Sequence, residues 1–223
     1  KKLLDNQRKF YKDALEEANK YSVKAFVLSE PADLSRTSVF IDILRKQQIK
    51  VYKLAKSFIK EGMEFKAGES YIVPVKQNEY RFIRSIFEPA TNFSDSTFYD
   101  ISTWVMPMSF NIPCVSINSE KEMAGLPGEE IKSVSMPKGE LIASSDAYAY
   151  LFDWNEYFTP KALYMLQDKG LITKVATQEF VYDDGSFRKK FSYGTILVTS
   201  FNQSLTKDEV FLLMKSVAEE CAI

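Results

Sequence analysis

Residues 65–73 read Phe-Lys-Ala-Gly-Glu-Ser-Tyr-Ile-Val, and residues 191–198 read Phe-Ser-Tyr-Gly-Thr-Ile-Leu-Val. Both stretches place a Phe-x-x-Gly turn directly before an apolar strand. Glycine has a physical reason to stand there, because a tight turn needs a positive φ that glycine adopts at little cost. The two stretches indicate that the chain contains two similar halves.

The segments around these turns follow the same order in both halves. A strand, a helix and a second strand are predicted at 25–28, 39–44 and 49–54 in the first half, and at 149–152, 162–166 and 172–175 in the second. A helix is expected after each turn strand. Because alternating strands and helices favour a parallel sheet, we predict an α/β fold with one doubly wound, mostly parallel sheet built from two similar β-α-β halves. The alternative is that any two β-α-β units look alike.

The predicted organisation is a linking helix followed by one domain. Residues 1–20 place apolar side chains at three-and-four spacing, as in an amphipathic helix that packs on something. Residues 21–223 form the single α/β domain, with halves at about 21–115 and 141–223 joined by a polar connection at 116–140. Because the chain opens with Lys1 inside the helix, we expect it to be a piece of a longer protein.

Composition limits the partners. The chain has 223 residues, of which 45% are hydrophobic, so it can bury a sizeable core. Its 29 basic and 30 acidic side chains give a formal net charge of −1, so no long-range field attracts nucleic acid. The longest apolar run, 147–152, is far shorter than the roughly 20 residues that cross a bilayer. We therefore expect no nucleic acid partner and no membrane span.

Histidine is absent from the sequence. This excludes His-dependent catalysis and histidine-ligated zinc within the chain. Cys114 and Cys221 form no CxxC pair and are too few for a disulfide framework, so they leave the redox compartment undetermined. Glycine-rich phosphate motifs are also absent. We expect no metal site and no cofactor in this chain.

Three stretches carry a resemblance to a known family. They are Tyr71-Ile72-Val73-Pro74-Val75, Phe98-Tyr99-Asp100-Ile101-Ser102-Thr103-Trp104 and Tyr150-Leu151-Phe152-Asp153-Trp154. Together they resemble bacterial zinc carboxypeptidase-family proteins, in the region downstream of the catalytic domain that is similar in fold to class I glutamine amidotransferases. The resemblance implies a flavodoxin-like doubly wound sheet, a periplasmic or secreted location, and zinc in a separate peptidase domain of the same protein.

Neither chemistry of that family transfers to these residues. The peptidase needs histidine ligands for its zinc, and the amidotransferase-like fold ordinarily carries a Cys-His-Glu triad. Cys114 and Glu30 are present as residue types, but the imidazole base is missing. The resemblance therefore implies a non-catalytic accessory domain that supports the peptidase domain or positions its substrate. The alternative is a domain that binds a small molecule, a peptide or a sugar.

Ligands of doubly wound sheets bind beyond the carboxyl ends of the strands. The candidate ligand-binding residues at such ends, and in the aromatic-rich segment 93–113 of the first half, are Glu30, Asp100, Trp104, Asp153, Trp154 and Asn155. For Asp153 or Asn155 we favour the role of a helix cap, and for Trp104 that of a core residue. An enzyme that works through Glu30, Asp100 and Asp153 alone, as glycosidases work through carboxylates, also stays open.

Overall fold

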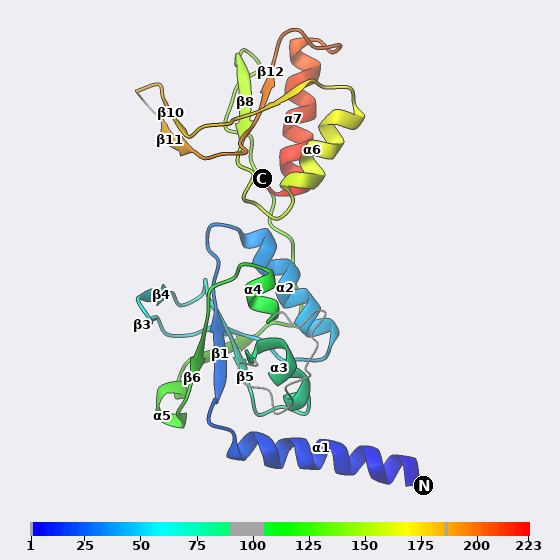
Figure 1. Cartoon of the computed structure of the whole chain (residues 1–223), viewed down its shortest axis with the longest axis vertical. Coiled ribbons are helices and arrows are strands. Elements are labelled where there is room, and N and C mark those ends of the chain that lie inside the picture. Colours follow the sequence, from blue (N-terminus) through cyan, green and yellow to red (C-terminus); the bar gives the residue numbers. More distant parts are fainter. Residues whose placement is uncertain (1, 90–104, 186) are drawn as a thin grey trace, which may run out of the picture. The chain divides into compact units, whose positions relative to one another are not determined.

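The computed structural model describes residues 2–89, 105–185 and 187–223. The chain divides into two compact units, unit 1 (Lys1–Ser135) and unit 2 (Met136–Ile223). Each unit has its own sheet, its own helices and its own β-hairpin (Figure 1). None of the described helices is both long enough and apolar enough to cross a membrane.

Unit 1 is built on a five-stranded sheet with the strand order β6-β1-β5-β2-β7. Its elements in chain order are α1 (Lys2–Lys20), β1 (Ala25–Leu28), α2 (Leu34–Lys46), β2 (Tyr52–Leu54), β3 (Phe58–Lys60), β4 (Met63–Phe65), β5 (Tyr71–Pro74), α3 (Tyr80–Phe87), α4 (Met106–Ser109), β6 (Cys114–Ile117), α5 (Glu120–Met123) and β7 (Pro127–Glu130). Strands β3 and β4 form a separate hairpin. The polar segment predicted as a connection thus contributes α5 and β7 to this unit.

Unit 2 is built on a three-stranded sheet with the strand order β8-β12-β9. Its elements are β8 (Ala149–Phe152), α6 (Thr159–Asp168), β9 (Thr173–Val175), β10 (Phe180–Asp183), β11 (Arg188–Phe191), β12 (Ile196–Thr199) and α7 (Lys207–Cys221). Strands β10 and β11 pair as a hairpin, as β3 and β4 do in unit 1. The residues of α6 and α7 pack against one face of the sheet.

The prediction of a doubly wound, mostly parallel sheet of the flavodoxin-like or glutamine amidotransferase-like kind is wrong. Every strand pairing among the described residues is antiparallel. In unit 1, β1 and β2 run in the same direction, but β5 lies between them and pairs antiparallel with both. In unit 2, β12 lies between β8 and β9 in the same way. Both units therefore contain a split β-α-β arrangement in which the strand after the Phe-x-x-Gly turn separates the two parallel strands.

The hairpins of the two units share a stacked aromatic pair. Phe58 and Phe65 are directly opposite each other in the β3–β4 hairpin, with ring centroids 5.3 Å apart and an interplanar angle of 19°. Phe180 and Phe191 are opposite each other in the β10–β11 hairpin, at 5.2 Å and 17°. Each second phenylalanine is buried. In each hairpin, the stacked pair joins the two strands at their open end. The second phenylalanine of the pair is also the first residue of the Phe-x-x-Gly turn.

The turn glycines also adopt the same conformation. Gly68 has φ +78° and Gly194 has φ +83°, as the sequence led us to expect of this turn. The Gly68 N–H donates to the carbonyl of Leu54 at 2.8 Å, and the Gly194 N–H donates to the carbonyl of Ala176 at 2.9 Å. Each turn is thereby tied to the end of the second strand of the β-α-β arrangement, which is β2 in unit 1 and β9 in unit 2.

A glutamine side chain fastens the start of that same strand in each unit. The Gln77 Oε1 accepts from the N–H of Lys50 at 2.7 Å, and its Nε2 donates to the carbonyls of Lys50 and Pro74 at 2.9 and 2.7 Å. In unit 2, Gln203 binds both main-chain groups of Ile172 at 2.8 and 3.0 Å and the carbonyl of Thr199 at 3.0 Å. We call these two arrangements the glutamine clamps.

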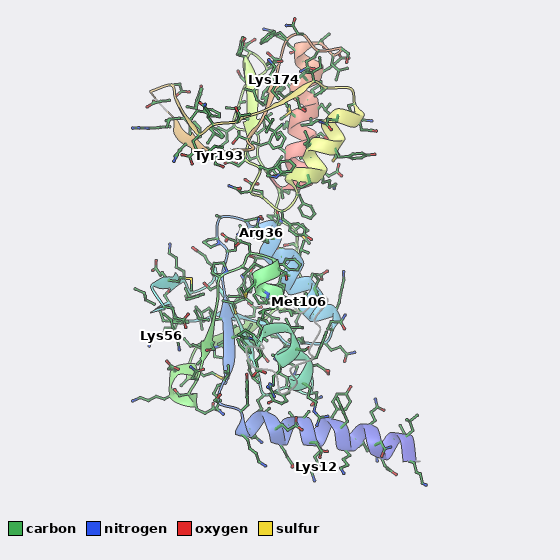
Figure 2. All side chains as sticks on the ribbon, viewed as in Figure 1. Lys12, Arg36, Lys56, Met106, Lys174 and Tyr193 are labelled. Carbon is green, nitrogen blue, oxygen red and sulfur yellow. The ribbon has the colours of Figure 1, made fainter. Side chains whose placement is uncertain are left out.

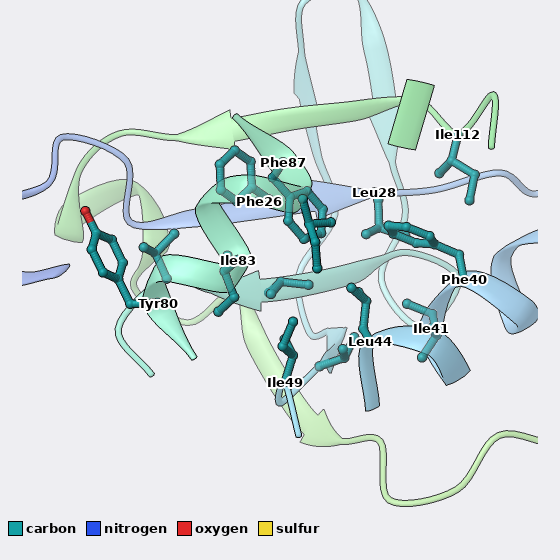
Figure 3. Close-up of a cluster of buried hydrophobic side chains, with 14 of the residues drawn as sticks. Phe26, Leu28, Phe40, Ile41, Leu44, Ile49, Tyr80, Ile83, Phe87 and Ile112 are labelled. Carbon is teal, nitrogen blue, oxygen red and sulfur yellow. The ribbon is translucent and has the colours of Figure 1, made fainter. Parts of the chain in front are cut away.

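The main core of unit 1 lies between its sheet and helices α2 and α3 (Figure 3). The rings of Phe26 and Phe87 stack with centroids 4.7 Å apart, and Phe40 meets Phe87 edge-on at 6.0 Å. A second cluster covers the opposite face of the sheet, where the β3–β4 hairpin and α5 supply side chains. Unit 1 therefore buries both faces of its sheet.

Helix α1 packs on unit 1 through its C-terminal half. Ala14 and Ala18 are buried in the main core. Arg81 of α3 holds α1 through a two-point ion pair with Glu17, at 2.6 and 3.0 Å. Near the N-terminal end, Leu3 is 81% exposed. The predicted amphipathic helix is confirmed, and only part of its apolar stripe is covered.

Candidate functional site

A groove of about 660 Å³ lies at the end of the unit 1 sheet where β2 begins and β5 ends. Its walls come from the end of α2, the start of β2, the turn after β5 and the edge strand β7. Arg45, Lys50, Tyr52, Lys76 and Glu130 represent these elements. The groove is thus formed by segments far apart in the sequence that the split β-α-β arrangement brings to one edge.

The wall formed by α2 and β7 is held by Arg45. Its Nε donates to the carbonyl of Ile131 at 2.9 Å, and its Nη2 donates to the carbonyl of Lys132. Asp42, one turn earlier on α2, lies 3.5 Å from the guanidinium. The Arg45 charge is therefore engaged in joining α2 to the chain that follows β7.

The opposite wall is held by the glutamine clamp of unit 1. Gln77 itself lines the groove and fixes the main chain of Lys50 and Pro74 on either side of it. Its side-chain amide forms hydrogen bonds with main-chain groups of Lys50 and Pro74 that would otherwise face the groove. The exposed side chains of this wall include those of Lys50 and Lys76.

Charges of both signs line the groove. Three ammonium groups, of Lys50, Lys76 and Lys132, and two carboxylates, of Glu79 and Glu130, lie in its walls. Within the part of the chain that the structure describes, none of these five groups forms an ion pair. The groove can therefore offer donors to an anionic group and acceptors to a cationic group of the same ligand.

A second hollow, of about 330 Å³, adjoins the groove and shares residues such as Glu79 with it. Helix α1 supplies Phe10 and Tyr11 to its wall, and α3 supplies Arg81. The Arg81 guanidinium lies 4.4 Å from the centroid of the Phe10 ring. This hollow gives the groove an aromatic extension toward α1.

The described residues of the predicted site are divided between the two units. Glu30 belongs to unit 1, where its Oε1 accepts from the N–H of Ala32 at 3.1 Å and shapes the turn into α2. Asp153, Trp154 and Asn155 belong to unit 2. Asp100 and Trp104 lie outside the described residues. No strand-end crevice of a parallel sheet exists in the described chain to unite these residues, because the strands are antiparallel.

Asp153, directly after β8, is bound by the β11–β12 side of unit 2. Lys189 Nζ lies 2.9 Å from Asp153 Oδ2, and the Thr195 hydroxyl lies 3.2 Å from Asp153 Oδ1. The side chain does not cap the next helix, since the N-cap of α6 is Phe158 and makes no side-chain cap hydrogen bond. The expected helix cap is wrong. Asp153 instead joins β8 to the hairpin and the buried Thr195.

The two residues after Asp153 contact the same turn. Trp154 packs on Gly194, where an added Cβ would lie 3.0 Å from the Trp154 Cβ. The Asn155 Nδ2 donates to the Ser192 Oγ at 3.4 Å. These contacts assign both side chains a structural role in holding the Phe-x-x-Gly turn of unit 2.

Cys114 lies on β6 and packs against the main core of unit 1. Burial, with a smaller contribution from the Glu61 carboxylate, raises the pKa of its thiol to about 12. The thiol is therefore protonated at neutral pH and is a poor nucleophile. In the described ranges, no three carboxylate or thiol side chains gather as they would around a metal ion.

Sequence reasoning missed the glutamine clamp and the groove beside it. A signal for the clamp was present, because Gln77 and Gln203 each lie nine positions after the turn glycine, from 68 to 77 and from 194 to 203. Aligning the halves by the Phe-x-x-Gly turn pairs the two glutamines. The lysines of the groove carried no such signal.

The resemblance to the zinc carboxypeptidase family stays a prediction from the three quoted stretches, one of which, 98–104, lies outside the described residues. The amidotransferase-like fold that it implies is not the fold of this chain. In comparisons with protein-family models, with curated proteins and with solved structures, nothing matches the chain.

Proposed function

We propose that this chain is a binding module whose unit 1 groove holds a small zwitterionic ligand, such as an amino acid or the end of a short peptide. The observation that carries the proposal is the set of five charged groups of both signs that line the groove without ion pairs to described residues. A ligand carboxylate suits the ammonium groups of Lys50 and Lys76. A ligand ammonium group suits the carboxylates of Glu79 and Glu130.

The groove is prepared for binding by contacts that do not involve its free charges. Arg45 joins α2 to the segment after β7, and Gln77 fixes the start of β2. Rigid walls lower the cost of ordering side chains when a ligand binds. The backbone positions of the lysines are thus set in advance, while their ammonium groups stay accessible.

The expected affinity is modest. Ion pairs at exposed positions contribute roughly 0.2–1 kcal/mol each, and the lysines of the groove are exposed. Two or three such contacts, with packing of a ligand stem on Tyr52 and Pro74, support binding at about the millimolar level, which corresponds to roughly 4 kcal/mol. Binding should weaken as salt rises, because exposed charges are screened.

The test is a titration followed by amide NMR shifts of the full chain. Glycine, a dipeptide, acetate, methylamine and glucose are added in turn. We expect the two zwitterions to shift the amides around the groove more than acetate, methylamine or glucose does. Lys50→Ala and Lys76→Ala should each weaken that response at least threefold.

Lys56→Ala is the matched control, because Lys56 is exposed on unit 1 in the turn before the β3–β4 hairpin and does not line the groove (Figure 2). This variant should respond as the unaltered chain does. Equal shifts with glucose and with the zwitterions, or a response that survives both groove substitutions, would contradict the proposal. The accessory role beside a peptidase domain stays a separate prediction, to be tested by co-purification with such a domain.

A further inference from the structure

The first strands of the two units, β1 and β8, differ in their pairing on the side away from β5 and β12. In unit 1, β1 lies between β5 and β6, and its residues Ala25 and Val27 are opposite Ile117 and Val115 of β6. In unit 2, β8 pairs with β12 on one edge, and no described strand pairs with its other edge. Among its described residues, unit 2 therefore has the strand that corresponds to β1 but not one that corresponds to β6.

The hydrogen-bonding pattern between β8 and β12 shows which main-chain groups of β8 point away from β12. The N–H of Ser200 donates to the carbonyl of Tyr148 at 3.0 Å, so hydrogen-bonded pairs with β12 fall on every second residue from Tyr148. The N–H and C=O groups of Ala149 and Leu151 consequently point away from β12. The corresponding groups in unit 1 are those of Ala25 and Val27, the residues that face β6.

The side chains on the outer face of unit 2 are also less covered. In unit 1, the cross-strand pair Val27 and Ile72 is 0% exposed, because Val115 lies beside Val27 in the sheet and the β3–β4 hairpin and α5 pack over that face. The corresponding pair in unit 2, Leu151 and Leu197, stays partly exposed. An apolar strip thus runs beside the open main-chain groups of β8.

Strand β8 has no feature that protects an edge. Its residues are Ala-Tyr-Leu-Phe, without a charge or a proline, whereas natural sheets use charged residues, above all lysine, to keep edges from pairing. The other edge of this sheet, β9, carries the exposed Lys174 (Figure 2). The sequence therefore discourages pairing at β9 and permits it at β8.

We propose that β8 accepts an extended segment of a partner protein as an additional antiparallel strand. The segment has apolar side chains at alternate positions, which pack beside Leu151 as Val115 packs beside Val27 in unit 1. Main-chain hydrogen bonds to Ala149 and Leu151 provide the affinity, and the alternate apolar side chains fix the register. The proposal concerns unit 2 and does not depend on the groove of unit 1.

The probe is a capped peptide with the sequence of residues 112–119, with serine in place of Cys114, added at millimolar concentration to the full chain. Residue-resolved amide exchange is the measurement. We expect exchange at Ala149 and Leu151 to slow at least fivefold, while Ala25 and Val27 keep their rates. A peptide with proline in place of Val115 should give no protection, since it cannot donate at that position.

Two variants of the chain complete the test. Ala149→Pro removes one outward N–H while leaving the β8–β12 ladder intact, and it should abolish protection of Leu151, whereas Ala149→Ser should keep it. Leu151→Lys places a charge on the open face and should weaken the peptide response at least tenfold. Protection by the proline peptide, protection confined to Ala25 and Val27, or concentration-dependent dimerisation through β8 without peptide binding would each overturn the proposal.

Discussion

Replacing Gln203 by methionine should loosen the start of β9 and leave unit 1 unchanged. Methionine keeps the length of the side chain but removes its three hydrogen bonds, two to Ile172 and one to Thr199. Each such bond contributes about 0.5–1.5 kcal/mol net. Ile172 is 59% exposed, so water replaces part of the loss, and we expect about 1–2 kcal/mol of local destabilisation.

Residue-resolved amide exchange measures this loss where it occurs. Because about 1.4 kcal/mol corresponds to a factor of ten, the Ile172 amide should exchange roughly 5–30 times faster in the variant. Gln77→Met is the reciprocal variant, and it should accelerate the Lys50 amide by a similar factor. The reasoning is refuted if either variant accelerates both amides equally, or if neither amide changes by more than twofold.

Three further changes test packing and ionisation. Gly139→Ala should destabilise unit 2 by about 1–3 kcal/mol in chemical denaturation, because the added Cβ would clash with the main-chain oxygens of Ala218, in α7, and of Ile223, two residues after α7. Gly194→Ala should cost more than Gly68→Ala, since both adopt a positive φ but only the first would meet Trp154; equal losses would contradict this contact. The raised pKa of Cys114 means that the folded chain holds this proton more tightly, so stability is lost as pH rises from 9 toward 12, by about 1.4 kcal/mol at pH 10. Denaturation at pH 8 and pH 10 should show a smaller loss for Cys114→Ala than for the unaltered chain.

Local structure was predictable wherever a short pattern determines it. The apolar run at 25–28 predicted a strand, and β1 covers those same residues, as β8 covers 149–152. The helical spacing around Phe40 and Leu44 predicted α2, whose buried face contains both residues. These elements follow from side chains within a few positions of one another, so the sequence alone suffices for them.

Strand order was not predictable in this way. A strand, a helix and a strand are equally consistent with adjacent parallel neighbours and with a third strand between them. The strand order is decided by the strand that follows the hairpin. This strand, β5 in unit 1 and β12 in unit 2, pairs with both earlier strands of its unit. This choice depends on contacts between residues distant in the sequence.

The candidate site was harder to predict from the sequence than the strand order, because its residue types are common. The chain has 29 basic and 30 acidic side chains, and nothing local distinguishes Lys50 or Glu130 from the others. The sequence instead favoured carboxylates next to aromatic residues. One of these, Asp153, forms an ion pair with Lys189 and accepts a hydrogen bond from Thr195. The groove becomes visible only when α2, β2, β5 and β7 are placed together.

Comparing the two units separates what the fold needs from what the groove adds. Both units keep the turn glycine, the stacked phenylalanines and the glutamine clamp. The clamp places Lys50 of unit 1 at the position of Ile172 in unit 2. By the same alignment, Glu79 corresponds to Leu205, two residues after each clamp glutamine. Unit 2 thus folds around the same framework without these charges, so the framework does not require them. Their presence in unit 1 accords with the binding role that we propose for the groove.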